Sequence, residues 1–351
     1  MLSDKTDIKE LSKEELVNWL SKRKIEAYRA NQILRWIYKR QADRFDQMTN
    51  LNKAIREKLD QHFQIRRLGK KTVEYSRDGS RKYLFRLPDN LCIESVLIPE
   101  KQHYTLCLSS QVGCAQGCRF CLTGKYGFFR NLTKNEIVSQ VRDIIKDIDD
   151  TSCLTNIVLM GMGEPLANYK NVLSAIGVIT DSKTGLNFSG RRITLSTVGL
   201  THQFMRLGHD TDVNLAVSLN ATDNRTRNRL MPVNRRHPIE KLLEACKDYP
   251  LKPRRKITIE YVLLKGVNDS PDDAHRLVRL LRPIKAKINL IPFNPHGGSE
   301  FSRPDDTTID RFQNILIKHN YTVMIRHSKG QDISAACGQL GTQYVDKSKA
   351  S

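Results

Sequence analysis

Three cysteines lie within eight residues of the chain, Cys114, Cys118 and Cys121, in the segment GCAQGCRFCLTG. A structural zinc ion takes four protein ligands and usually draws them from two C-x2-C pairs, whereas this C-x3-C-x2-C spacing supplies three thiols. Ferredoxin motifs also carry a fourth cysteine. Three thiolates can hold three irons of a [4Fe–4S] cube and leave the fourth iron open. We therefore expect a cluster with an open iron; a zinc site completed by a distant His or Cys is the alternative.

An open iron can take a small bidentate ligand, and the amino and carboxylate groups of S-adenosylmethionine fit that vacancy. One electron passed from the cluster into the sulfonium would break a C–S bond and give an adenosyl radical. The spacing of the cysteines therefore indicates radical chemistry at this site.

The elements that must position these cysteines alternate between strand and helix. Short β-branched runs recur between amphipathic helical patterns, which is typical of repeated β-α units in a parallel sheet. In a barrel of such units the active site lies at the C-terminal ends of the strands, and the cysteines directly follow the first strand. We predict an α/β fold, a partial (β/α)6 barrel, with a doubly wound sheet as the alternative. The expected strands are 104–109, 156–161, 192–197, 214–219, 256–263, 287–293 and 321–326.

The residues before this barrel show two different patterns, first a helical one and then a strand-like one. Residues 8–65 have apolar residues at helical spacing, and a Ser12–Glu15 capping box opens the first helix. Residues 70–99 read as short strands around an Asp-Gly turn. We predict four segments: an N-terminal helical RNA-binding module at 1–66, a β-hairpin linker region at 67–100, the barrel at 101–346 and a tail at 347–351.

The chain is strongly basic. Its 351 residues carry 58 Lys and Arg against 38 Asp and Glu, a formal charge of +20. That charge attracts polyanions, with nucleic acid ahead of an anionic membrane because no single basic amphipathic helix dominates. The apolar runs are far shorter than the ~18 residues of a spanning helix, and the first residues do not resemble a signal peptide. We therefore expect a cytosolic protein. The basic residues are concentrated in four clusters, at 66–71, 225–229, 234–237 and 252–256.

Longer motifs around these positions resemble one family. The segments SSQVGCAQGCRFCLTGKYGFFRNLT, LMGMGEPLAN, RRITLSTVGL, INLIPFNP and DISAACGQL are similar to those of the RlmN/Cfr family of radical SAM RNA methyltransferases, and closer to RlmN than to Cfr. The resemblance covers essentially the whole chain. It implies methylation of C2 of an adenine in 23S rRNA and in tRNA next to the anticodon. Methylation at C8, as in Cfr, and a non-enzymatic RNA-binding protein that holds zinc are the alternatives.

The resemblance also implies cofactors and partners. It implies one [4Fe–4S] cluster held by three cysteines and two molecules of S-adenosylmethionine per turnover. We further expect an electron donor such as flavodoxin or ferredoxin, no membrane, and a monomeric enzyme.

Several polar residues follow the predicted strands. A carboxylate such as Glu164 can accept from an amino group, and the glycine before it lets the backbone approach a ligand closely. Without the resemblance, these positions also suit plain turns and helix caps. Asn220 departs from the family, whose RlmN members often have His there, so a role that needs an imidazole does not carry over. The resemblance implies S-adenosylmethionine contacts at Gly163, Glu164, Ser196, Ser218, Leu219, Asn220 and Asn294.

Two further cysteines and one glutamate complete the expected site. Adenine C2 is electron-poor and cannot attack a methyl sulfonium, but a carbon radical can add to it. The resemblance implies that Cys337 becomes S-methylated and then bonds to the base, that Cys107 forms a transient disulfide with it, and that Glu94 accepts the ring proton. Small buried apolar residues are the plainer interpretation of both cysteines, and a surface carboxylate that of Glu94.

The remaining cysteines match no motif, and we read Cys92, Cys153 and Cys246 as structural. Close to the clustered cysteines, the segment KYGFFRNL at 125–132 offers aromatic rings that could stack on an extruded base. The same rings are equally consistent with ordinary packing.

Overall fold

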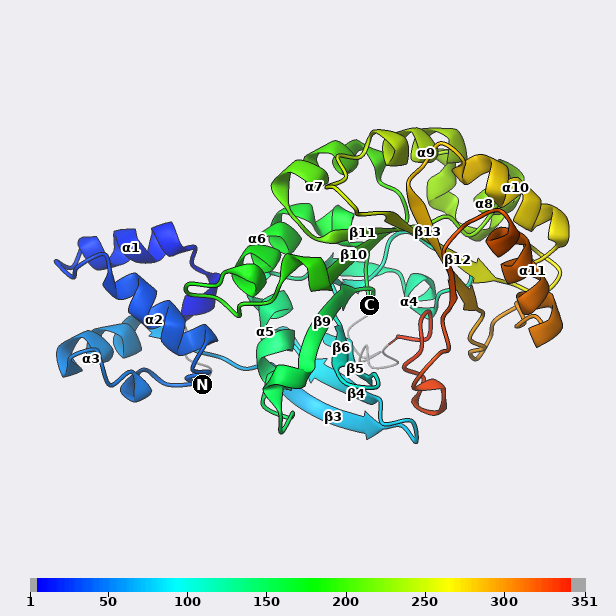
Figure 1. The fold of residues 1–351 in the computed structure, drawn as a ribbon. Coiled ribbons are helices and arrows are strands. Elements are labelled where there is room, and N and C mark those ends of the chain that lie inside the picture. The colour runs from blue at the N-terminus through cyan, green and yellow to red at the C-terminus, as the bar shows by residue number, and fades with distance from the viewer. Residues whose placement is uncertain (1–4, 342–351) are drawn as a thin grey trace.

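A single curved sheet forms the body of the molecule in the computed structural model, which describes residues 5–341 (Figure 1). The end of the predicted barrel and the predicted tail 347–351 therefore lie outside the described residues. The strand order is β14-β13-β12-β11-β10-β9-β6-β5-β4-β3. The seven strands at the β14 end pair in parallel: β6 (Tyr104–Cys107), β9 (Leu154–Leu159), β10 (Ile193–Thr197), β11 (Asn214–Ser218), β12 (Ile257–Leu263), β13 (Ala286–Pro292) and β14 (Val323–Ile325).

Helices connect these parallel strands and cover the outside of the curved sheet, which confirms the predicted partial barrel (Figure 1). The Thr133–Glu136 side chains form the capping box that begins α5. Apolar faces of the helices then pack on the sheet, and most of its central strand residues are buried. The helices are α5 (Lys134–Ile145), α6 (Tyr169–Thr180), α7 (Phe204–Asp210), α8 (Asn224–Leu230), α9 (Ile239–Asp248), α10 (Pro271–Leu281) and α11 (Asp306–Lys318).

Three antiparallel strands extend the same sheet beyond the barrel. They are β3 (Gly69–Tyr75), β4 (Arg81–Arg86) and β5 (Cys92–Pro99). β5 pairs antiparallel with β6, where Val96 lies opposite Cys107. The hairpin region is thus continuous with the barrel sheet, because its last strand, β5, pairs with the first barrel strand, β6.

The N-terminal module stands to one side of the barrel, next to α5 and α6 (Figure 1). It contains α1 (Lys13–Ser21), α2 (Arg29–Tyr38) and α3 (Lys53–His62), and the short strands β1 (Thr6–Asp7) and β2 (Phe63–Gln64) pair in parallel. The Ser12–Glu15 capping box opens α1 as predicted.

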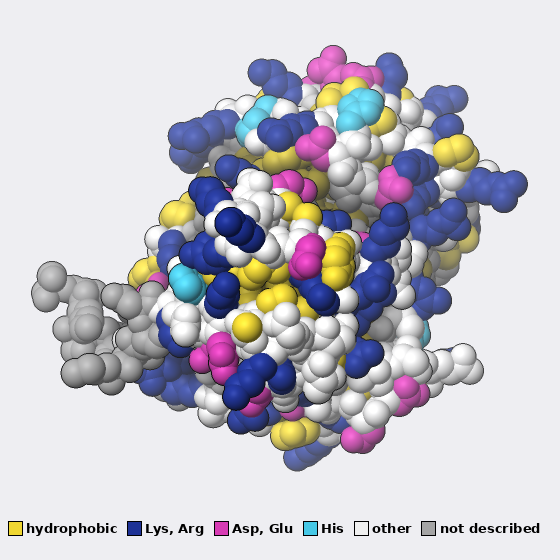
Figure 2. Space-filling view, turned by 90° about the vertical axis from the view of Figure 1, so that its left-hand side faces the viewer, with side chains coloured by type: hydrophobic (Ala, Val, Ile, Leu, Met, Phe, Trp, Pro, Cys, Tyr) yellow, Lys and Arg dark blue, Asp and Glu magenta, His cyan; other side chains and the backbone are white. Residues whose placement is uncertain are grey.

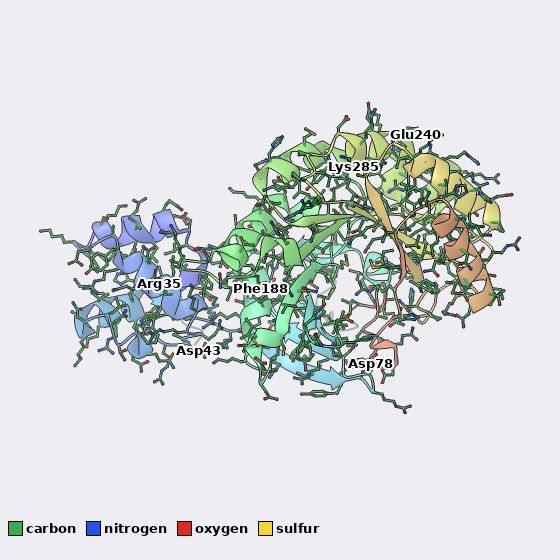
Figure 3. All side chains as sticks on the ribbon, viewed as in Figure 1. Arg35, Asp43, Asp78, Phe188, Glu240 and Lys285 are labelled. Carbon is green, nitrogen blue, oxygen red and sulfur yellow. The ribbon has the colours of Figure 1, made fainter. Side chains whose placement is uncertain are left out.

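A buried charged network joins this module to α5. Arg142 is fully buried, and its Nε donates to the Ile37 carbonyl at 3.1 Å while its Nη2 lies 2.9 Å from Asp43 Oδ1. Arg67 contacts Asp43 at 2.7 Å and Asp143 at 2.6 Å. Figure 3 labels Asp43, which belongs to this network, and Arg35, which makes a separate contact with the barrel through the Lys183 carbonyl. Because a buried charge must be paired and hydrogen-bonded to be tolerated, this network fixes how the module sits on the barrel.

Among residues 5–341, no helix is both long and apolar enough to span a membrane.

Candidate active site

One cavity opens at the C-terminal ends of the parallel strands, where the barrel geometry places an active site. Its walls come from the segments that follow β6, β9, β10, β11 and β13, and from the C-terminal segment. Ten of the residues singled out from the sequence line it together: Cys114, Cys118, Cys121, Gly163, Glu164, Ser196, Ser218, Asn220, Asn294 and Cys337. Leu219, Cys107 and Glu94 do not line this cavity.

The three clustered cysteines lie between β7 (Gln111–Gly113) and the short helix α4 (Leu122–Lys125). Gly113 must be glycine, because a Cβ there would come within 2.0 Å of the Gly127 carbonyl oxygen and its φ is +73°. Burial raises the pKa of the Cys114 thiol to about 12 and that of Cys118 well above its usual range, and the neighbouring cysteines raise both further. The free thiols therefore hold their protons, which binding of iron or zinc must displace.

The donor set fits an iron–sulfur cluster. Three sulfur ligands line one cavity that also presents the polar side chains expected to hold S-adenosylmethionine. Within the described chain, no three or more His, Cys, Asp and Glu side chains converge on a point as a single metal ion requires. Three thiols beside polar side chains in one cavity are the groups that a three-cysteine cluster with an open iron needs.

Glu164 is a buried carboxylate held by three donors. It accepts from Thr197 Oγ1 at 2.7 Å, from the Val198 backbone N–H at 2.9 Å and from the Leu166 N–H at 3.2 Å. Burial nevertheless raises the pKa of Glu164 to about 7. Gly163 precedes it with φ +101°, and a Cβ at that position would lie 2.5 Å from the Gln111 Cβ. The turn thus presents a fixed carboxylate that can accept from a ligand's amino group.

The other predicted cofactor contacts divide into two kinds. Ser196 and Ser218 end β10 and β11 at the cavity, and the Ser196 hydroxyl lies 3.4 Å from Glu260 Oε2. The Asn220 side chain makes a hydrogen bond within the protein, because its Oδ1 accepts from the Val262 N–H at 2.8 Å. Its φ is +58°, a left-handed conformation that asparagine tolerates. Leu219 is fully buried in the core, so only its backbone can take part in the site.

Glu260 is a residue that the sequence reasoning missed. It lies on β12 within an otherwise apolar run, is buried and faces the cavity. Burial raises its pKa. A single glutamate inside the strand-forming run KITIEYVL is the signal that could have found it, because carboxylates are rarely buried without a partner.

The C-terminal segment closes one side of the cavity and is tied down along its length. The Leu122 N–H donates to the Gly338 carbonyl at 2.8 Å, and Thr123 Oγ1 donates to the Leu340 carbonyl at 2.5 Å. Asn294 Nδ2 donates to the Cys337 carbonyl at 3.0 Å. The cysteine loop and the segment that carries Cys337 therefore hold each other in place.

Cys337 lies between two cavities. It lines the cavity of the clustered cysteines, and it also lines a second one together with Cys107, Asn289 and Arg326. Cys107, the last residue of β6, is buried, and burial next to Cys337 raises its pKa to about 12. Both are free thiols in the structure. The fold thus brings together two cysteines that are far apart in the sequence.

Glu94 lies on β5, next to the end of the C-terminal segment that carries Cys337. Its Oε2 accepts from the Gly341 N–H at 2.9 Å, and Lys82 Nζ lies 3.9 Å from its Oε1. Burial raises the pKa of this carboxyl group. The side chain is buried and not on the surface, and its partners place it behind the segment that carries Cys337.

Aromatic rings are exposed next to the site, and the side of the molecule formed by the N-terminal module is basic. Lys and Arg side chains are spread over the face on the side of the N-terminal module (Figure 2). Tyr126, Phe128 and Phe129 remain exposed beside the cysteine loop. Arg130 is already engaged, because it pairs with Glu136 at 2.8 Å and with Asp89 at 2.6 Å. Exposed rings beside a basic surface can stack on nucleic-acid bases.

Comparison with known proteins defines the class first. Residues 108–278 match the radical SAM superfamily, and residues 6–65 match the ribosomal RNA large subunit methyltransferase N-terminal domain. The structure superposes with a TM-score of 0.90 on the crystal structure of a radical SAM methyltransferase from Sphaerobacter thermophilus, which is 42% identical, over 95% of this chain and 99% of that one. The fold is that of a radical SAM enzyme, a class that uses a [4Fe–4S] cluster and S-adenosylmethionine.

Relatives then define the family. The chain is 58% identical to the dual-specificity RNA methyltransferase RlmN of Desulfosudis oleivorans, over 95% of this chain and 90% of the relative. It is 54% identical to the protein of the same name from Geobacter sulfurreducens, over 95% of this chain and 91% of the relative. The chain belongs to the RlmN family, which confirms the resemblance inferred from its motifs.

Proposed function

We propose that this protein methylates C2 of an adenine in 23S rRNA and in tRNA next to the anticodon. The observation that carries the proposal is the position of Cys337 between the cavity of the clustered cysteines and the cavity of Cys107. A thiol there can receive a methyl group on one side and meet a second thiol on the other. Membership in a family of dual-specificity RNA methyltransferases supports RNA as the substrate.

When bound, the cluster on Cys114, Cys118 and Cys121 and two molecules of S-adenosylmethionine per turnover supply methyl groups and the radical chemistry that an electron-poor ring carbon needs. Glu164 and Gly163 orient the cofactor's amino acid end, and the polar ends of β10, β11 and β13 hold the remainder. Side chains of the protein then carry out the transfer of the methyl group to the adenine.

In the proposed sequence, the Cys337 sulfur takes up a methyl group by displacement and later bonds to C2 of the adenine through that carbon. Glu94 accepts the proton that leaves the ring carbon. The Cys107 sulfur then bonds to the Cys337 sulfur as the bond from that sulfur to the transferred carbon breaks, and the carbon takes up a proton and leaves as the methyl group of the base. A two-electron reductant such as a cellular dithiol returns this transient disulfide to two thiols.

We further propose that residues 1–66 bind RNA, that 67–100 connect this module to the barrel of 101–346, and that the protein acts as a monomer with a flavodoxin or ferredoxin as electron donor. The exposed rings of Tyr126, Phe128 and Phe129 would stack on an extruded base. Arg and Lys on the module would contact phosphates.

The decisive experiment compares two cysteine variants on a 23S rRNA fragment and on tRNA. Cys337→Ala is expected to give no methylation and no covalent RNA adduct on a denaturing gel. Cys107→Ala is expected to accumulate the adduct, because the bond from Cys337 to the base cannot be resolved. Cys153→Ala, at a cysteine whose thiol donates a hydrogen bond to Asp150, is the matched control and should methylate normally.

Four outcomes would contradict the proposal. Methylation by Cys337→Ala would refute a covalent bond from Cys337 to the base. Absence of an adduct with Cys107→Ala would refute the role of Cys107 in resolving that bond. Mass spectrometry that finds the methyl group on C8 would favour the Cfr-like alternative. Zinc without iron and sulfide in anaerobically purified protein would favour the non-enzymatic one.

A further inference from the structure

One arginine in the basic segment 225–229 does not reach the surface. Arg227 on α8 is fully buried, and all five of its N–H groups are used. Nε donates to the Leu219 carbonyl at 3.0 Å, and Nη2 donates to the carbonyls of Val198 at 2.8 Å and Ser218 at 3.1 Å. Nη1 donates to Asn234 Oδ1 at 2.8 Å and to the His237 carbonyl at 3.2 Å. The side chain is therefore unavailable to RNA.

Every acceptor of this guanidinium is a neutral oxygen. Burial lowers the pKa of Arg227 to about 10, so the group stays charged at neutral pH. Within residues 5–341, no ion pair joins Arg227 to an Asp or Glu side chain. A buried ion without a counter-charge costs several kcal/mol, even when its hydrogen bonds are satisfied. The other large buried guanidinium, that of Arg142, has Asp43 as its carboxylate partner.

The cysteine loop lies against the end of α8, the helix that carries Arg227. Cys118 packs against Leu230 and Met231 at the end of α8, and the Arg119 N–H donates to the Leu230 carbonyl at 3.0 Å. Two thiols, Cys118 and Cys246, act to raise the pKa of Arg227, and no carboxylate acts comparably. Of the two, only Cys118 belongs to the cysteine loop. Three thiolates around a [4Fe–4S] core leave a net negative charge, which one-electron reduction increases.

We propose that Arg227 is the buried counter-charge of the cluster and that it makes the cluster easier to reduce. This inference rests on the proposed function only in placing the cluster on the three cysteines. A fixed positive charge stabilises the more negative, reduced cluster more than the oxidised one. The same guanidinium holds the backbone carbonyls of Val198, Ser218 and Leu219, so Arg227 also positions the strand ends that border the cofactor cavity.

The test separates charge from structure with two substitutions at one position. Arg227→Gln removes the charge, and Arg227→Lys keeps it, while neither can serve all five acceptors. Each protein is loaded anaerobically with its cluster, and the midpoint potential is measured by a redox titration followed by electron paramagnetic resonance. Thermal unfolding of the cluster-free proteins measures the structural loss independently.

Arg227→Gln is expected to disfavour cluster reduction at least tenfold, a shift of about 59 mV to more negative potential for one electron. Arg227→Lys is expected to keep a potential close to that of the unchanged protein although both variants unfold at lower temperature. Arg229→Gln, on the same helix but with a side chain 53% exposed, is the control and should leave the potential in place. Equal potentials in the Gln and Lys variants would overturn the proposal.

A second variant covers the case in which Arg227→Gln does not fold. Asn234→Asp is nearly isosteric and places a negative charge at the atom that now accepts from Arg227 Nη1, which neutralises the guanidinium without removing it. The same negative shift is expected, and an unchanged potential would count against Arg227 as the counter-charge. Absence of iron in the unchanged protein would instead refute the cluster assignment, so the two failures are distinguishable.

Discussion

Replacing Arg142 with methionine should loosen the N-terminal module from the barrel at a cost that follows from its contacts. Methionine fills part of the volume but leaves the Ile37 carbonyl without its donor and removes one cation from Asp43. Removing one partner of a buried pair typically costs about 3–5 kcal/mol. Because Asp43 keeps its contacts with Arg67 and Lys146, we expect the lower end of this range, about 3 kcal/mol.

Denaturant unfolding of the cluster-free protein measures this loss, and limited proteolysis reports whether the module is released first. At roughly 2–4 °C per kcal/mol for chains of this order of size, the melting temperature should fall by about ten degrees. Arg35→Met is the control, since Arg35 Nε donates to the Lys183 carbonyl at 3.1 Å on an exposed contact and its loss should cost less than about 1 kcal/mol. Equal losses in the two variants would refute the assignment of the network as the main attachment.

Two further predictions concern ligands. Glu164→Gln should weaken S-adenosylmethionine binding to the cluster-loaded protein by roughly 10- to 100-fold, because a hydrogen bond to a charged group is worth about 1.5–3 kcal/mol; calorimetry that finds an unchanged Kd would contradict the role of the carboxylate. RNA affinity should fall on the order of a thousandfold between 50 and 200 mM salt if at least six phosphates are contacted; a Kd independent of salt in a filter-binding assay would exclude the basic surface as the main RNA contact.

The barrel could be predicted from the sequence because its elements are locally encoded. Each expected strand from 104–109 to 321–326 is an apolar β-branched run, and the Thr133–Glu136 capping box begins α5 where the sequence places it. The cysteine spacing and its position after the first strand were sufficient to propose the cluster. The confirmed parts depend on short-range patterns.

The parts that could not be predicted depend on long-range contacts. Arg227 stands in a polar run that is typical of a surface helix, and only the fold shows that backbone carbonyls from distant strands surround it. Arg142 likewise meets Asp43 about a hundred residues away. The antiparallel strands β3–β5 read as a separate hairpin because pairing of β5 with β6 is not encoded in either strand alone.

The mutual anchoring of the cysteine loop and the C-terminal segment has a consequence for how the enzyme matures. During synthesis the three clustered cysteines leave the ribosome long before Cys337, so the cofactor cavity can begin to fold without the proposed acceptor thiol. A chain that stops short of residue 337 keeps the clustered thiols but lacks the Gly338 and Leu340 carbonyls that accept from Leu122 and Thr123. Such a truncated product would have a poorly held cluster loop and would lack the proposed methyl acceptor, so on the proposed function a premature stop codon even near the end of the gene would abolish activity.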